Sequence, residues 1–256
     1  MRNMKTRYAF APVLLAAALA LPAAAMRPAA PIPRAPNQPM TPVILDPGHG
    51  GDDEGAIVRG LREKDLALVF AKKLKARLAR NEDLPVVLTR DSDRYVKLDE
   101  RLIDSVDMSG SIFVSLHLNQ VKGKKAAGAI IYSYGPEQLR RWRKRSHPSV
   151  PPMPAAPKGQ AADGASLARL FSRTLRADGF VAESSKSDYY VLKNPAVPSV
   201  LIELGYLNNP VEAAKLSDPA YQDKMVDSLA KAIEEYATTR TLRVESPIAA
   251  KVVSKR

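Results

Sequence analysis

The chain has 256 residues, of which 45% are hydrophobic and 26% are charged, and its formal net charge at pH 7 is +12. These values lie in the globular range and indicate one domain large enough to bury a substantial core. The chain has no cysteine, which excludes disulfides, thiolate metal sites and a lipid-modified N-terminal cysteine. The positive charge suits an acidic polymer or an ordinary basic surface equally well. No nucleic-acid-binding motif is present, so we expect no nucleic-acid partner.

The N-terminus has the pattern of a secretory signal. A basic start is followed by the uncharged stretch Tyr8–Leu21 and the small residues Ala23–Ala25. We expect a cleaved signal peptide over residues 1–25, and then a Pro-rich extended linker over residues 26–41. An uncleaved anchor is the alternative, but prolines shorten the apolar run below a comfortable span. We therefore expect a periplasmic protein with no stable membrane span after cleavage.

Strands and helices are expected to alternate over a domain of residues 42–239. Short β-branched or apolar runs predict strands at residues 43–45, 86–88, 112–116, 128–132, 189–192 and 199–204. Helical spacing of apolar residues predicts helices from Glu63 to Leu78, around 98–106, over 166–177, and from Pro219 through Tyr236. This alternation predicts a single α/β domain, with a twisted, largely parallel or mixed sheet flanked by helices on both faces.

Two segments break this alternation. Residues 137–157 combine five basic residues around Trp142 with five prolines, and we expect an exposed insertion between a strand and a helix. His147 lies within it and is expected to be an uninvolved surface residue. The tail over residues 240–256 is basic and weakly periodic, so we expect disorder there.

Four residues have positions that suit chemistry. His49 and His117 follow the predicted strands 43–45 and 112–116, and α/β sheets bind ligands beyond the carboxyl ends of their strands. Glu63 opens a predicted helix, and Glu203 ends an apolar strand where a carboxylate is costly unless its charge is used. Each also has an ordinary interpretation: a structural histidine, a helix-dipole acid, or an exposed acid at a strand end.

Taken together, the four residues form a recognisable chemical set. Two imidazoles and one carboxylate are the ligands of several catalytic zinc sites, and a second carboxylate can transfer protons beside the metal. None of the spacings is a short metal motif, so the residues alone do not decide whether this is a metal site. The same donor set also leaves other divalent metals possible, although two histidines and a glutamate favour zinc.

Four ordered blocks around these residues resemble the zinc-dependent N-acetylmuramoyl-L-alanine amidases. They are VILDPGHGGDDEGAIVRGLREKD, LTRDSDRYVKLDERL, SIFVSLHLN and YYVLKNPAVPSVLIELGYLNNP, and the resemblance extends from Val43 to Tyr236. It departs from the family pattern at Leu116, Leu118 and Tyr206. None of these changes removes a ligand, although Leu118 could alter the wall of the substrate groove.

The resemblance implies a function and a role for each residue. It implies zinc-dependent hydrolysis of the amide between the lactyl group of N-acetylmuramic acid and L-alanine, in cell-wall remodelling or daughter-cell separation. Zn²⁺ would be held by His49, Glu63 and His117, with Glu203 as general base and then acid. Asp46 and Asn119 are weaker candidates for orienting the ligands, and either could instead cap a local turn.

The resemblance also leaves alternatives. Some family members carry an inserted helix that blocks the zinc cleft until an activator protein binds, so residues 137–157 are expected to be either such an element or a solvated loop. Another exported zinc peptidase, acting on the peptide stem, would keep the same metal site. An inactive wall-binding scaffold is the third reading, and the presence of all four site residues argues against it.

Overall fold

The computed structural model describes most of the domain between the expected linker and the tail. The expected signal peptide, the linker, residues 137–157 and most of the tail lie outside the described residues. No helix among the described residues is long and apolar enough to span a bilayer. The described residues are 42–103, 111–121, 123, 126–135, 158–194 and 197–245.

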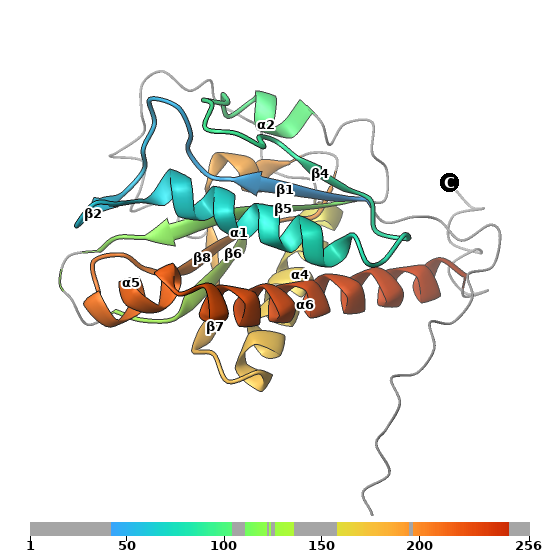
Figure 1. Ribbon diagram of the computed structural model, residues 1–256. Helices are drawn as coiled ribbons and strands as arrows, with labels where there is room; N and C mark the ends of the chain where they lie inside the picture. The colour runs from blue at the N-terminus through green and yellow to red at the C-terminus, as the bar shows by residue number, and fades with distance from the viewer. Residues whose placement is uncertain are drawn as a thin grey trace, which may run out of the picture. The chain divides into compact units, whose positions relative to one another are not determined.

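A six-stranded sheet forms the centre of this domain (Figure 1). Its spatial order is β4-β1-β5-β8-β6-β7. Strands β4, β1, β5 and β8 run parallel, whereas β6 is antiparallel to β8 and pairs with β7 in parallel. The sheet is therefore mixed, which confirms the predicted α/β class. The strands are β1 (Val43–Pro47), β4 (Val86–Leu88), β5 (Ile112–Asn119), β6 (Ala129–Tyr134), β7 (Ala182–Ser187) and β8 (Ser199–Tyr206).

Three long helices cover one face of the sheet. They are α1 (Glu63–Leu78), α4 (Lys158–Ala177) and α6 (Pro219–Glu245), and α6 lies beside both α1 and α4 (Figure 1). A short helix, α5 (Pro210–Ser217), connects β8 to α6. The main core lies here, because alternate strand residues such as Val114 and Ile202 point into these helices.

The opposite face carries a smaller apolar cluster. The four-residue helix α2 (Glu100–Ile103) and the 3₁₀ helix η3 (Tyr190–Lys193) supply its cover, together with strand residues such as Phe113 and Leu201. Helices thus flank both faces as expected, but unequally: within the described residues, the second face has only short elements. We call this second face the open face, because among the described residues no long helix covers it.

Several boundaries differ from the sequence prediction. Residues 190–193 form η3 rather than a strand, because β-branched and aromatic residues there pack as one apolar turn onto the sheet. Strand β7 and the hairpin β2 (Ile57–Val58)–β3 (Leu61–Arg62) were not predicted. Helix α4 begins at Lys158 instead of near 166, and α6 continues to Glu245, so residues 240–245 are helical and not part of a disordered tail.

Candidate metal centre

The first histidine lies on a tight loop that follows β1. Strand β1 ends at Pro47, and His49 has a left-handed backbone with φ of 59°, which is uncommon for a residue other than glycine. Two buried arginines hold this loop through its carbonyls: Arg90 donates to the carbonyls of Pro47 and Gly48, and Arg101 donates to those of Pro47 and His49. The backbone of His49 is therefore fixed from both sides.

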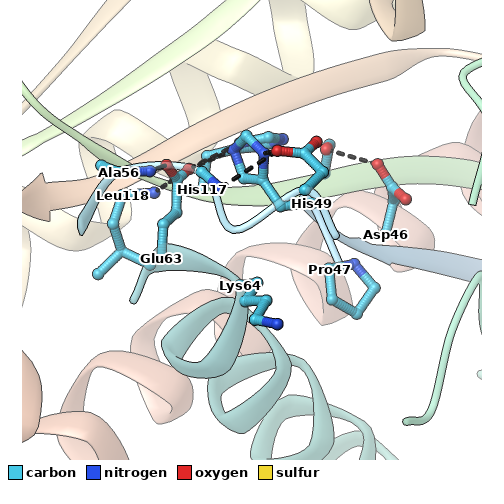
Figure 2. A network of polar contacts seen from close by, with 12 residues as sticks. Asp46, Pro47, His49, Ala56, Glu63, Lys64, His117 and Leu118 are labelled. Atoms are coloured by element: carbon cyan, nitrogen blue, oxygen red, sulfur yellow. Dashed lines mark hydrogen bonds and ion pairs between the residues drawn. The ribbon is translucent and has the colours of Figure 1, made fainter. Parts of the chain in front are cut away.

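The carboxylate of Glu63 lies at the centre of the site. The hairpin β2–β3 turns the chain back from the His49 loop, so that Glu63 is the first residue of α1 and 5% exposed. Its Oε1 accepts from Leu118 N at 3.1 Å, and its Oε2 accepts from Ala56 N at 2.9 Å. Figure 2 shows this carboxylate beside Ala56 and Leu118, with the two histidine rings next to it. The backbone bonds fix both oxygens, which prepares them to bind a cation.

The second histidine comes from the middle of the sheet. His117 lies on β5, and its Nδ1 is 2.9 Å from Glu63 Oε1, while His49 Nε2 is 3.0 Å from the same oxygen. The two rings are edge to face, with centroids 4.9 Å apart. One ligand atom from each of His49, Glu63 and His117 lies within 4.8 Å of the others. Among the described residues, this is the one group of three such side chains arranged to hold a metal ion.

Glu203 lies next to this cluster. In the register of the parallel strands β5 and β8, Glu203 is paired with His117, so both side chains leave the same face of the sheet. The residue is 9% exposed, and its Oε2 is buried without a hydrogen-bond partner in the described structure. A buried carboxylate oxygen without a partner is costly to maintain, which points to a use in chemistry.

The four side chains line one cavity of about 390 Å³. A larger cavity, of about 720 Å³, lies between α4, β7 and α6 and is bordered by Arg169, Arg173 and Arg176. No group of metal-ligating side chains is found there within the described residues, so we assign the site by its chemistry rather than by cavity size. The smaller cavity is completed by Gly55, Ala56, Leu118, Asn119, Gln120, Tyr189 and Leu201.

Electrostatics separate the two glutamates. Burial raises the pKa of Glu63, but hydrogen bonds from His117 and His49 outweigh it and hold that pKa well below its usual range. Burial raises the pKa of Glu203 to about 7; the nearby Glu63 carboxylate adds to this effect, and the histidines oppose it. One carboxyl group is thus prepared to stay ionised and the other to exchange a proton near neutral pH.

The two weaker candidates occupy different positions. Asp46 is buried and accepts from Thr89 Oγ1 at 2.6 Å, Ser115 Oγ at 2.7 Å and Arg101 Nη1 at 2.7 Å. These partners are 43 to 69 residues away in sequence, so Asp46 is not a local turn cap. Its side chain is connected to the loop of His49 by Arg101, which also donates to the His49 carbonyl. Asn119 lines the cavity, and its carbonyl accepts from Leu207 N.

Sequence reasoning missed several residues that build the site. Arg90 and Arg101 lie in the block LTRDSDRYVKLDERL, where nothing local distinguishes a buried arginine from an exposed one. Gly48 allows His117 to pack against the loop, since a Cβ there would lie 2.3 Å from His117 Cε1. Asp53, which accepts from His49 Nδ1 at 2.9 Å, was also not predicted. Its place four residues after His49 in a glycine-rich loop was the available signal.

Comparison with known proteins agrees with this geometry. A family model described as N-acetylmuramoyl-L-alanine amidase matches residues 43–235, which include all four site residues. The chain belongs to this amidase family. That membership confirms the resemblance seen in the four sequence blocks.

The similar proteins match about three quarters of this chain, over differing shares of their own length. The probable cell wall amidase LytH of Staphylococcus saprophyticus is 29% identical over 199 residues, covering 76% of this chain and 57% of LytH. The chain therefore spans less than two thirds of that relative's length. The catalytic domain of CwlV, an amidase from Bacillus (Paenibacillus) polymyxa, is 27% identical with a TM-score of 0.64, covering 77% of this chain and 98% of that domain.

A third similar protein was solved together with a partner protein. The CwlD amidase of Clostridioides difficile was solved in complex with the GerS lipoprotein. CwlD is 26% identical to this chain with a TM-score of 0.63, and the match covers 78% of this chain and 99% of CwlD. The amidase fold is thus shared over nearly the whole described domain.

Proposed function

We propose that this chain is a zinc-dependent N-acetylmuramoyl-L-alanine amidase, which hydrolyses the amide between the lactyl group of N-acetylmuramic acid and L-alanine in peptidoglycan. The observation that carries the proposal is the pairing of two features in one cavity. His49, Glu63 and His117 converge as a three-ligand group, and the unpartnered carboxylate of Glu203 lies beside them. Family membership supplies the substrate class.

The three residues fit a zinc ion. Two imidazole nitrogens and one carboxylate oxygen are a ligand set used by catalytic zinc sites, which keep a further position open for water or substrate. The ligand atoms already lie within 4.8 Å of one another, and the site opens into a cavity. When bound, zinc supplies Lewis acidity, which polarises a carbonyl oxygen and lowers the pKa of water to about 7.

Glu203 is the proposed proton carrier. Its Oε2 takes a proton from the attacking water and gives it to the leaving nitrogen of L-alanine, so that the amine departs neutral. A pKa of about 7, caused by burial, suits a group that must accept and then return a proton. The position of Glu203 on β8, opposite His117 on β5, places this carboxylate beside the ligand cluster without making it a member of that cluster.

Other residues prepare the site before substrate binds. Ala56 N and Leu118 N hold Glu63, and Arg101 holds the His49 carbonyl while Asp46 neutralises the arginine. We propose that Asp46 positions the loop indirectly, through Arg101, and that Asn119 shapes the cavity wall. Ligands held by such bonds need little reorganisation when a cation enters.

We further propose that the enzyme acts outside the cytoplasm, in the periplasm, after removal of residues 1–25. Its relatives include the probable cell wall amidase LytH, and its N-terminus has the pattern of a secretory signal. Residues 137–157 are the proposed contact for an activator protein, an idea supported in kind by the CwlD–GerS complex. Deleting residues 137–157 tests this: unchanged basal activity would exclude autoinhibition.

Product analysis on isolated muropeptides tests the reaction. The amidase leaves an intact sugar and a stem peptide with a free L-alanine N-terminus, whereas a stem peptidase leaves L-alanine attached to the sugar. Mass spectrometry distinguishes these products directly. The proposal is supported if peptide with an N-terminal L-alanine is released, if a chelator stops this release, and if zinc restores it. A product in which L-alanine is still attached to the muramoyl group would overturn the proposal.

A further inference from the structure

The side chain of Asp53 contacts the metal-binding loop at two points. Its Oδ1 accepts from His49 Nδ1 at 2.9 Å and from Gly55 N at 3.2 Å. The backbone of Asp53 is also paired with Gly50, through N–O distances of 2.8 and 3.2 Å. The residue is therefore anchored at its main chain, and its carboxylate is directed at the outer edge of the histidine ring.

This contact assigns the two ring nitrogens of His49 to different partners. An ionised carboxylate only accepts hydrogen bonds, so Asp53 can hold Nδ1 only as an N–H donor. The other nitrogen, Nε2, lies 3.0 Å from Glu63 Oε1 and faces the ligand cluster. A cation that enters the cluster therefore meets Nε2, while Asp53 keeps the hydrogen on Nδ1.

The two histidines approach the cluster differently. His117 turns Nδ1, not Nε2, toward Glu63 Oε1, at 2.9 Å. Gly48 lies against the His117 ring, where a Cβ would be 2.5 Å from Nε2 and 2.6 Å from Nδ1, so steric contact fixes that ring. The ring of His49 is packed on one side by Gly55, where a Cβ would lie 2.6 Å from Cδ2. Its outer nitrogen, by contrast, is held by the carboxylate of Asp53.

We propose that Asp53 is a positioning residue that holds the outer nitrogen of His49, Nδ1, and so presents Nε2 to the metal. The inference rests on the proposed zinc site, since it assigns how one ligand of that site is prepared. It also predicts a mixed ligand set, with Nε2 from His49 and Nδ1 from His117. A carboxylate bonded to the outer nitrogen of a ligand histidine typically contributes about 10- to 100-fold to metal affinity.

The alternative is that Asp53 only shapes the turn, through its bond to Gly55 N. Two substitutions separate the roles. Asp53→Asn keeps an oxygen for Gly55 N and for His49 but removes the charge, whereas Asp53→Ala removes both bonds. Asp52→Ala is the matched control, because Asp52 is the neighbouring acid, is exposed like Asp53, and makes no side-chain hydrogen bond among the described residues.

The first experiment measures the zinc dissociation constant of the full chain and each variant by competition with a chromophoric chelator. We expect affinity weaker by about 10- to 100-fold for Asp53→Ala, a smaller loss for Asp53→Asn, and no change for Asp52→Ala. Circular dichroism of the metal-free proteins checks folding. Wild-type affinity in a folded Asp53→Ala variant would overturn the inference. If the Asp53→Ala variant does not fold, wild-type zinc affinity in Asp53→Asn would overturn the inference instead.

A second readout does not depend on activity. The chain has three histidines, so nitrogen-15 spectra of histidine-labelled protein are simple to assign with His147→Gln. In the zinc-bound chain we expect Nε2 of His49 to hold the metal, and we expect its Nδ1–H to exchange with water more slowly than in Asp53→Ala. Zinc held through Nδ1 of His49, or an equal exchange rate in the two proteins, would contradict the inference. A wild type that binds no zinc would instead overturn the proposed function.

Discussion

On one face of the sheet, strand side chains pack beneath α1, α4 and α6, whereas on the other face the same strands carry Asp46, Ser115, His117 and Glu203. The strand period of two produces this division, so that Ile202 enters the core and Glu203 enters the cavity. The covered face supplies burial, and the open face supplies polar groups held in fixed positions. Neighbouring residues of one strand are therefore expected to have separable effects on stability and on chemistry.

The largest expected effect is on the open face, at Glu203. Glu203→Gln keeps the shape of the side chain but removes its ability to accept the proton, so we expect kcat to fall by about 10²- to 10⁴-fold. Zinc affinity should be retained, because Glu203 is not a member of the ligand group. Steady-state kinetics on muropeptides and a zinc titration measure the two quantities.

An exposed acid provides the control for that variant. Glu183 is solvent-exposed on the edge strand β7, and Glu183→Gln should leave both kcat and zinc affinity unchanged. Near-normal turnover in Glu203→Gln would remove this residue from the proposed mechanism.

Asp46 is the next test, because it lies on the open face but acts on stability. Asp46→Asn leaves Arg101 buried without its charge partner, and we expect a loss of about 3–5 kcal/mol in the free energy of unfolding. Urea denaturation at neutral pH measures the loss. A variant as stable as the wild type would show that the buried pair contributes nothing net.

The same pair predicts a pH dependence. Burial opposes ionisation of Asp46, but Arg101, Thr89 and Ser115 outweigh it and lower the pKa of this carboxyl below its usual range. Its contribution to stability is therefore full above the unfolded-state pKa of about 3.9 and is lost as pH falls through the lower folded-state pKa. In Asp46→Asn, the loss of stability that protonation of Asp46 causes at acidic pH should be absent, and urea denaturation at several pH values measures it.

Gly48→Ala tests the packing between the loop and the second histidine. The new methyl group would lie 2.3 Å from His117 Cε1, so the ring must move and zinc affinity should fall by about 10- to 100-fold. Gly159→Ala is the control, since nothing lies within 4 Å of a Cβ on that α4 residue. Unchanged zinc affinity in Gly48→Ala would mean that the loop relaxes without disturbing His117.

The smallest effect is expected from the covered face. Ile202→Val removes one buried methylene from the core and should cost about 0.5–1.5 kcal/mol in unfolding free energy. Its activity should match the wild type, although Glu203 is the next residue. A loss of kcat larger than the loss of stability would show that the two faces are coupled.

Much of the fold could be predicted because the central strands carry continuous apolar runs. Residues 112–116 and 199–204 were predicted as strands and lie within β5 and β8. Strand β7 was missed because AESSKS, at the sheet edge, has mostly exposed or half-buried side chains and no apolar alternation. Residues 190–193 were misassigned because aromatic and β-branched residues favour strands locally, whereas packing on the sheet selects a 3₁₀ turn.

The residues of the candidate site also differ in whether the sequence could identify them. His49, Glu63, His117 and Glu203 could be identified because each lies at an element boundary or in an apolar strand, where its polarity stands out. Arg90 and Arg101 could not be, because their partners are carbonyls and a carboxylate distant in sequence. Their burial is a consequence of tertiary packing, which a charged residue's local sequence does not show.

Digestion of intact, purified peptidoglycan is the most direct test of the central claim. The wild-type chain, the chelator-treated chain and the zinc-restored chain are compared, and soluble products are identified by mass. The account predicts release of whole stem peptides beginning with L-alanine, lost with the chelator, regained with zinc and abolished in Glu203→Gln. Release of stem peptides at the same rate without zinc would contradict it.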